Sequence, residues 1–175
     1  VARAKARLEE ITGRPVLGFR APSFSILPGM EWAFDILLET GHTYDSSVFP
    51  IRRSGYGWPG APTQPFDIIR PGGTLREYPM TTLDLLGLRI PAAGGGYLRQ
   101  FPFGIIRRAF RNRERQGREG MFYVHPWEVD PDQPRIDCGR LTALRHYRGL
   151  ERTLPRLDRL LGEFRFSAVH PLADS

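Results

Sequence analysis

The sequence predicts an α/β fold, and three observations support this prediction. Segments typical of helices alternate with short apolar runs typical of strands, an order characteristic of α/β proteins with mostly parallel strands. Polar residues of catalytic type follow three of the predicted strands, namely Arg20, Asp45 and His125. The 175 residues, 41% hydrophobic and 25% charged, are enough for one domain with its own hydrophobic core.

Four elements are predicted in the first fifty residues. Residues 1–11 are rich in good helix formers, and a glycine suited to end a helix follows them. The run Val16–Phe19 indicates a buried strand, and Arg20–Ser23 must be a loop because Pro22 disfavours helix in the residue before it. A second helix is expected over Met30–Thr40, and a strand end or loop over Tyr44–Ser47.

The rest of the chain contains loops and four further predicted elements. Residues 50–79 are rich in proline and glycine and indicate long loops with short strands, around Asp67–Ile69 and Leu75–Tyr78. Gly94-Gly95-Gly96 indicates a flexible turn or a close backbone approach. It is not a phosphate-binding loop, because the Lys-Ser/Thr that ends such a loop is missing. The further elements are a helix over Phe103–Gln116, a strand over Met121–Val124, an amphipathic helix over Arg148–Leu161 and a short strand over Phe164–Phe166.

The net charge of +6 does not by itself indicate an anionic partner. Lys5 is the only lysine, and a basic set made almost entirely of arginine is more typical of genome base composition than of phosphate binding. The densest basic run, residues 107–115, falls on a predicted helix, where a solvated face explains it. No apolar stretch approaches 18 residues. We therefore expect neither nucleic acid nor a membrane as a partner.

Cys138 is the only cysteine, which excludes an internal disulfide and a cysteine-based zinc site. The presence of a single cysteine slightly favours a reducing, cytoplasmic compartment for the protein. The N-terminus has neither an initiator Met nor the charged-then-apolar pattern of a signal peptide. We therefore expect Val1 to be an internal start, with any targeting segment upstream of it.

His125 is the strongest catalytic candidate. It follows the apolar run Met121–Val124, and an imidazole near neutrality is suited to proton transfer. The structural alternative is a histidine that only hydrogen-bonds a nearby carbonyl. The other histidines, His42, His146 and His170, lie in polar or terminal contexts and receive no role.

Four more residues have both a functional and a structural interpretation. Asp45 could orient a histidine or cap a loop. Arg20 could clamp a carboxylate or form a structural salt bridge. Trp127 and Glu128 could line a sugar site, since an aromatic face suits the apolar face of a pyranose, although Trp127 could equally belong to the core.

Three segments taken together resemble the later motifs of the polysaccharide deacetylase superfamily: Phe19–Ser25, Tyr44–Ser47 and Phe122–Glu128. Gly94–Tyr97 and Asp130–Pro134 are similar to the subgroup found in exopolysaccharide gene clusters of exosortase-containing bacteria. The resemblance extends from Val1 to about Phe166, and the ordered combination is fairly specific.

The resemblance implies the C-terminal portion of a distorted (β/α) barrel and metal-dependent removal of acetyl groups from N-acetylated sugars of a polysaccharide. In the family, an early Asp-Asp motif supplies the catalytic base and one metal ligand, and a His-x-x-x-His motif supplies the other two. Neither motif occurs in this chain. We therefore expect residues 1–175 to be the C-terminal part of a deacetylase domain and to be inactive alone. The divalent metal, which we expect to be zinc, would be bound by other residues of the intact parent protein.

The resemblance also assigns roles to individual residues. Arg20 would steady the catalytic base, and His125 would be the general acid, held in place by Asp45. Trp127, Tyr123 and Tyr97 would contact the substrate, and no residue of the chain would bind the metal.

The sequence departs from the family pattern at several positions. Ser23 stands where the family often has an aromatic residue, and Asp45-Ser46-Ser47 replaces the usual Asp-Trp. Tyr123 replaces a common leucine, which changes the shape expected for the acetyl pocket.

Two other functions remain open. A cyclic amide or ureide amidohydrolase of the same superfamily also contains the Tyr44–Ser47 motif. A non-catalytic module that binds an anionic polymer would bind in a salt-sensitive way without any need for His125. The sequence predicts no particular oligomeric state.

Overall fold

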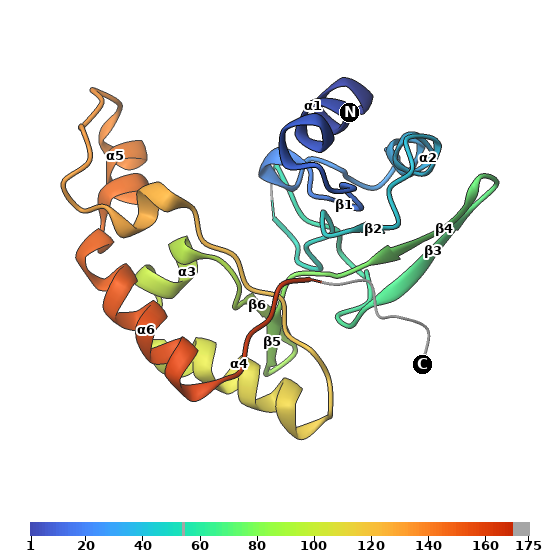
Figure 1. The fold of residues 1–175 in the computed structure, drawn as a ribbon. Helices are drawn as coiled ribbons and strands as arrows, with labels where there is room; N and C mark the ends of the chain where they lie inside the picture. The colour runs from blue at the N-terminus through green and yellow to red at the C-terminus, as the bar shows by residue number, and fades with distance from the viewer. Residues whose placement is uncertain (54, 170–175) are drawn as a thin grey trace. The chain divides into compact units, whose positions relative to one another are not determined.

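The computed structural model describes residues 1–53 and 55–169, which form two compact units (Figure 1). Unit 1 comprises residues 1–80 together with Val169, and unit 2 comprises residues 81–168. Each unit has its own hydrophobic core. His170, a histidine without an expected role, lies outside the described residues.

Unit 1 is built on a mixed four-stranded sheet with the strand order β1-β2-β4-β3. The central strand β2 pairs in parallel with both β1 and β4, whereas β3 and β4 form an antiparallel hairpin. The strands are β1 (Gly18–Phe19), β2 (Tyr44–Asp45), β3 (Phe66–Arg70) and β4 (Gly73–Glu77). The helices are α1 (Ala2–Thr12), the short 3₁₀ turn η1 (Pro22–Phe24) and α2 (Trp32–Glu39).

Helix α2 packs against the sheet of unit 1 at β3 and β4, as Figure 1 shows. Its apolar side chains Phe34 and Leu37 are buried. They join a core that also contains Ala21, Ile26, Val48, Ala61 and Leu75. The apolar face that the sequence predicts for this helix is therefore its contact with the sheet.

The parallel register of unit 1 brings polar residues to one edge of the sheet. Phe19 of β1 lies opposite Asp45 of β2, which lies opposite Glu77 of β4. Each of these residues is the last of its strand. Because the carboxyl ends of parallel strands share one edge, Asp45 and Glu77 become direct neighbours there, and Arg20 follows β1 at the same edge.

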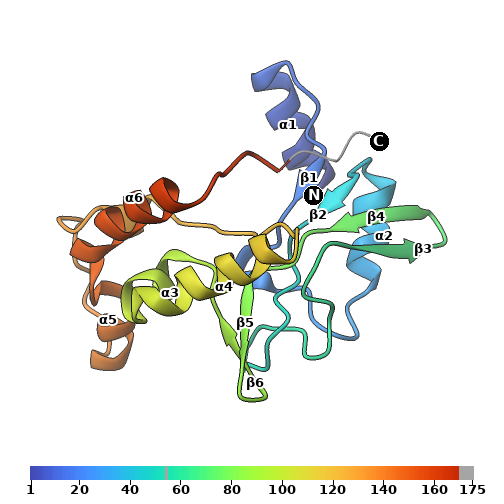
Figure 2. The same ribbon diagram turned by 90° about the horizontal axis from the view of Figure 1, so that it is seen from below.

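Unit 2 combines a two-stranded hairpin with helices (Figure 2). The hairpin consists of β5 (Thr82–Leu85) and β6 (Leu88–Pro91). The helices are α3 (Gly95–Gln100), α4 (Phe103–Arg115), η2 (Pro126–Val129), α5 (Arg140–Tyr147), η3 (Leu150–Arg152) and α6 (Thr153–Glu163). Helix α3 packs against α4 and α6, and α4 packs against β5. The core includes Leu83, Leu98, Phe103, Ile106, Phe110 and Leu160.

The predicted α/β class is confirmed, with a mixed rather than a mostly parallel sheet. Three predicted helices agree closely with α1, α2 and α4. The fourth, expected over Arg148–Leu161, is divided into η3 and α6. In the part of the chain that the structure describes, the strands form an open sheet and a separate hairpin, and they close no barrel.

Two predicted strands are wrong. Met121–Val124 is extended, but only Met121 makes a bridge, with its carbonyl accepting from the Thr81 N–H at 3.4 Å. Phe164–Phe166 also forms no strand. Both runs have high strand propensity, yet a strand needs a partner with which to pair, and propensity carries no information about that partner. The hairpin β5–β6 and the helices α3 and α5 were not predicted.

Across residues 1–53 and 55–169, every helix is too short or too polar to cross a membrane.

Candidate functional site

The sheet edge of unit 1 carries two buried carboxyl groups side by side. Asp45 and Glu77 both have no exposed surface. Asp45 accepts the Ser47 N–H at 2.9 Å and the Ser47 hydroxyl at 2.7 Å, one with each carboxylate oxygen. Glu77 accepts the Val48 N–H at 3.0 Å through Oε1. The sequence predicted Asp45 at this edge and missed Glu77.

Burial and mutual repulsion set the protonation of this pair. Burial is the main cause that raises the pKa of Glu77 well above its ordinary value, and the neighbouring charge of Asp45 raises it further. Burial also raises the pKa of Asp45, although hydrogen bonds from Glu77 and Ser47 oppose this. Glu77 Oε2 is buried and has no hydrogen-bond partner within residues 1–53 and 55–169. The raised pKa favours a protonated Glu77 beside Asp45.

Arg20 binds the segment that follows Asp45. Its Nε donates to the Ser46 carbonyl at 2.9 Å, and its Nη2 donates to the Ser46 hydroxyl at 2.8 Å. The Ser46 hydroxyl in turn donates to the Tyr78 carbonyl at 2.7 Å. The structure thus brings Arg20 and Asp45 to one place, linked through Ser46. The role of Arg20 in steadying a catalytic base stays a prediction.

The loop after Arg20 has an unusual backbone. Ser23 and Phe24 have φ values of 57° and 53°, in the left-handed region that bulky residues rarely adopt. The ring of Phe24 is buried against Phe49, with the ring centroids 5.4 Å apart. Such strain is often found at functional sites, where the surrounding packing maintains it.

His125 lies in unit 2, in the residue before the turn η2. Its side chain is 54% exposed, so the imidazole is accessible to a substrate. The Nδ1 atom lies 3.2 Å from Oε2 of Glu128, and the His125 N–H donates to the same oxygen at 3.0 Å. This arrangement suits proton transfer, because a carboxylate contacts one ring nitrogen while the ring itself is accessible to solvent. The predicted contact between His125 and Asp45 stays a prediction.

Glu128 is itself held by a buried arginine. Both side chains are 3% exposed, and Nη1 of Arg99 donates to Oε1 of Glu128. Arg99 also donates to the backbone carbonyls of Arg145, His146 and Arg148, at 3.1 to 3.2 Å. The pair connects α3, η2 and the end of α5.

Aromatic rings surround His125. Tyr123 meets the imidazole edge-on at 5.4 Å between ring centroids, and Trp127 lies nearly parallel to it at 5.9 Å. Trp127 also stacks on His146 at 4.1 Å. Of the three predicted substrate residues, Tyr123 and Trp127 therefore lie beside His125. Tyr97 packs instead on Phe101 and against the core of unit 2.

The sequence did not predict the roles of Arg99, His146 and Glu128. Arg99 and His146 have no local signal, because their contacts come from distant parts of the chain. Glu128 was expected only as a possible sugar contact. Its spacing from His125, with Pro126 between them, is the pattern of a helix capping box, and this could have predicted that the carboxylate folds back onto His125.

The described residues do not fit the metal that the resemblance implies. A catalytic zinc usually has three protein ligands, and no group of three His, Cys, Asp or Glu side chains within residues 1–53 and 55–169 is placed to hold an ion. The neighbouring carboxyl groups of Asp45 and Glu77 are two such side chains, one fewer than a zinc site usually has. Three of their four oxygens accept hydrogen bonds from Ser47 or Val48, and the fourth, Glu77 Oε2, is buried without a hydrogen-bond partner in the described part of the chain.

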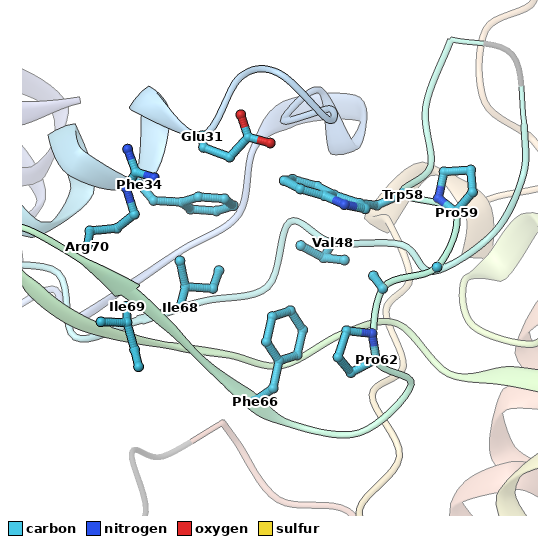
Figure 3. Close-up of a pocket in the computed structure, with 12 residues that line it drawn as sticks. Glu31, Phe34, Val48, Trp58, Pro59, Pro62, Phe66, Ile68, Ile69 and Arg70 are labelled. Atoms are coloured by element: carbon cyan, nitrogen blue, oxygen red, sulfur yellow. The ribbon is translucent and has the colours of Figure 1, made fainter.

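A separate cavity of about 470 Å³ lies in unit 1 (Figure 3). Its walls are mainly apolar, and the rings of Phe34, Trp58 and Phe66 contribute to them. Two charged residues also line it, Glu31 and Arg70, and Arg70 is bound by Asp35 through two hydrogen bonds of 2.6 and 2.7 Å. Its volume is typical of ligand pockets, but none of the predicted catalytic residues lines it.

Comparison with known proteins gives one match. Searches among curated proteins and among solved structures find no match. A family model described as "Domain of unknown function (DUF3473)" matches residues 46–174. The matched range contains Glu77, Arg99, His125 and Glu128, and it begins directly after Asp45. Since it covers most of the sequence, the chain belongs to the DUF3473 family.

Proposed function

We propose that this chain carries the proton-donating part of a metal-dependent polysaccharide deacetylase, an enzyme that hydrolyses the acetyl amide of N-acetylated sugar residues. The observation that carries the proposal is the setting of His125, an accessible imidazole with a buried carboxylate on Nδ1 and aromatic rings beside it. The resemblance of the sequence to the later deacetylase motifs gives the reaction class. In this proposal, the parallel strands of unit 1 belong to a distorted (β/α) barrel.

His125 would act on the leaving nitrogen. In amide hydrolysis, the oxygen of water forms a bond to the acetyl carbon, and the carbon–nitrogen bond breaks to give acetate and an amine. An amine anion is a poor leaving group, so the nitrogen must gain a proton as the bond breaks. The protonated imidazole supplies that proton from Nε2, and it keeps the hydrogen on Nδ1, which faces Glu128.

The rings beside His125 would contact the sugar. Trp127 and Tyr123 lie within 6 Å of the imidazole, measured between ring centroids, and aromatic side chains offer apolar contact together with a polar handle. His146 stacks on Trp127, and the Arg99 guanidinium lies over the same ring at 5.2 Å from its centroid, so the sugar would meet the part of the ring that these side chains leave exposed.

The divalent ion that the resemblance implies would be held by residues other than those described. It would polarise the acetyl carbonyl and activate the attacking water. Every step assigned to this chain is a proton transfer or a substrate contact made by its own side chains.

Replacing His125 tests the proposal. In the longer polypeptide that we expect to contain this chain, His125→Ala should lower kcat by about 10²–10⁴-fold, the usual contribution of a general acid, and should change KM little. Acetate release from N-acetylated oligosaccharides, normalised to the folded fraction, measures the effect. Turnover close to wild type in folded His125→Ala would show that another group is the acid.

The same assay separates the two other functions. Release of product from cyclic imides or ureides, without deacetylation of chitooligosaccharides, would identify a cyclic amidohydrolase. Binding of anionic polymer that weakens with salt and is unchanged in His125→Ala, without turnover of either substrate class, would identify a non-catalytic module.

A further inference from the structure

We infer that the buried Glu128–Arg99 pair holds His125 in the tautomer that carries its proton on Nδ1, so that Nε2 is the nitrogen presented to a substrate. Glu128 is then a positioning residue for His125. The assignment of the tautomer stands on the geometry of unit 2 alone, and its catalytic consequence rests on the proposed function.

The contacts of one oxygen determine the tautomer. Glu128 Oε2 lies 3.0 Å from the backbone N and 3.2 Å from Nδ1 of His125. An ionised carboxylate has no hydrogen to donate, so Nδ1 must be the donor in this contact. In the neutral imidazole, the other nitrogen then has a free lone pair.

The arginine pairs with Glu128 and fixes its position. A carboxylate that is 3% exposed would be costly without a paired charge. Arg99 supplies that charge to Oε1, and three backbone carbonyls hold the guanidinium in turn. With one oxygen bound to Arg99 and the other to His125, the carboxylate cannot turn away from the imidazole.

The glycine run makes room for this carboxylate. A Cβ atom on Gly95 would overlap the Glu128 carboxylate group. Gly94 has φ = 100°, and a Cβ there would lie 2.6 Å from the Tyr123 ring, which packs against His125. Of the two alternatives that the sequence left open for Gly94-Gly95-Gly96, a flexible turn or a close backbone approach, the structure shows the close approach at Gly94 and Gly95. The group that Gly95 approaches is the one that holds His125.

A purely structural role for Glu128 gives a different expectation. The bond from the His125 N–H to Glu128 is a helix cap, which stabilises η2 whether or not the imidazole takes part. A cap requires no particular tautomer of His125. The tautomer therefore distinguishes a positioning role from a structural one.

Nuclear magnetic resonance can read the tautomer directly. Long-range ¹H–¹⁵N correlation spectra of the purified chain, at a pH where the imidazole is neutral, report which ring nitrogen carries the proton. His125→Asn identifies the signals. We expect the Nδ1–H form to predominate in the wild type and the Nε2–H form, which a free imidazole favours, to predominate in Glu128→Ala. Glu163→Gln, a loss of a carboxylate in α6 of the same unit, should leave the His125 signals unchanged.

The wild-type spectrum is decisive even if Glu128→Ala does not fold. A predominant Nε2–H form in the wild type would overturn the inference, and so would an unchanged Nδ1–H form in folded Glu128→Ala.

Kinetics separate this inference from the proposed function. In the longer polypeptide, Glu128→Ala should lower kcat by about 10- to 100-fold, the usual effect of removing a carboxylate behind an imidazole, with little change in KM. A large loss in His125→Ala with wild-type kcat in Glu128→Ala would overturn the positioning role. Wild-type turnover in His125→Ala would overturn the proposed function, while the tautomer would still stand as measured.

Discussion

At the scale of single residues, the buried pair Asp45 and Glu77 affects how stability depends on pH. The two side chains are neighbours in the parallel register of β2 and β4, and neither is exposed. Two ionised carboxylates in that position would repel each other in a medium of low dielectric constant. A proton on Glu77, which its raised pKa favours, removes this repulsion, and the stability of unit 1 therefore depends on pH.

The sign of this dependence follows from the raised pKa of Glu77. A carboxyl group whose pKa is higher in the folded state than in the unfolded state stabilises the fold while it is protonated. That contribution is complete below 4.5, the ordinary pKa of a glutamate, and is lost as the pH rises through the higher folded value. We expect the free energy of unfolding, measured with urea across this range, to fall by up to about 1.4 kcal/mol per pH unit.

Glu77→Gln should reduce this slope, because the amide imitates the protonated acid and does not titrate. The part of the slope that is left comes from Asp45, whose pKa burial also raises. His42 titrates in an overlapping range with the opposite sign, since burial lowers its pKa and stability is lost as the pH falls. The informative quantity is therefore the difference between Glu77→Gln and wild type. Glu39→Gln, at an exposed position of the same unit, is the control. Equal slopes in wild type and Glu77→Gln would contradict a protonated Glu77.

At the scale of elements, α3 and η2 are in close contact at Gly95. Helix α3 begins at Gly95, where the Glu128 carboxylate of η2 lies against the backbone. The turn η2 is fixed at its start by the bond from His125 to Glu128. The position of the imidazole is therefore set by contact between two short elements, neither of which would be stable alone.

Two glycine substitutions with the same chemistry should act in opposite directions. Gly95→Ala should destabilise the chain by about 1–3 kcal/mol, because the new methyl group overlaps the Glu128 carboxylate. Gly162→Ala, in α6 with no atom near the new methyl group, should stabilise it by up to about 1 kcal/mol through helix propensity. Urea denaturation measures both. A stabilising Gly95→Ala would show that Glu128 is not held as described.

At the scale of the whole molecule, the sheet of unit 1 ends in a strand that pairs on one side only within the described residues. Strand β3 is the last of the order β1-β2-β4-β3, and its Ile69 side chain is 79% exposed. Unpaired strand edges and exposed apolar side chains favour association with another chain. We expect the purified chain to self-associate in a concentration-dependent way.

Ile69→Lys should shift the chain toward monomer in sedimentation velocity experiments, because a lysine on an edge strand opposes strand pairing. Ile11→Lys is the matched control, since Ile11 is also exposed but lies on helix α1 of the same unit. A wild-type chain that sediments as a monomer at every concentration would contradict the expectation, and an equal effect of both substitutions would exclude β3 as the interface.

The sequence alone determined features that depend on local composition and on periodicity. The helices α1, α2 and α4 follow from helix-forming residues and their stops. Arg20 and Asp45 were correctly expected at strand ends, and a close backbone approach was one of the two alternatives expected for the glycine run. Each of these signals lies within a few neighbouring residues, where propensity and spacing carry the information.

Only the tertiary structure decided which distant residues meet. Glu77 becomes the partner of Asp45 through strand register, and Arg99 reaches Glu128 across 29 residues of sequence. Met121–Val124 has the composition of a strand but no ladder, because no strand lies in place to pair with it in the part of the chain that the structure describes. Pairing depends on the arrangement of whole elements in space, and local composition does not encode that arrangement.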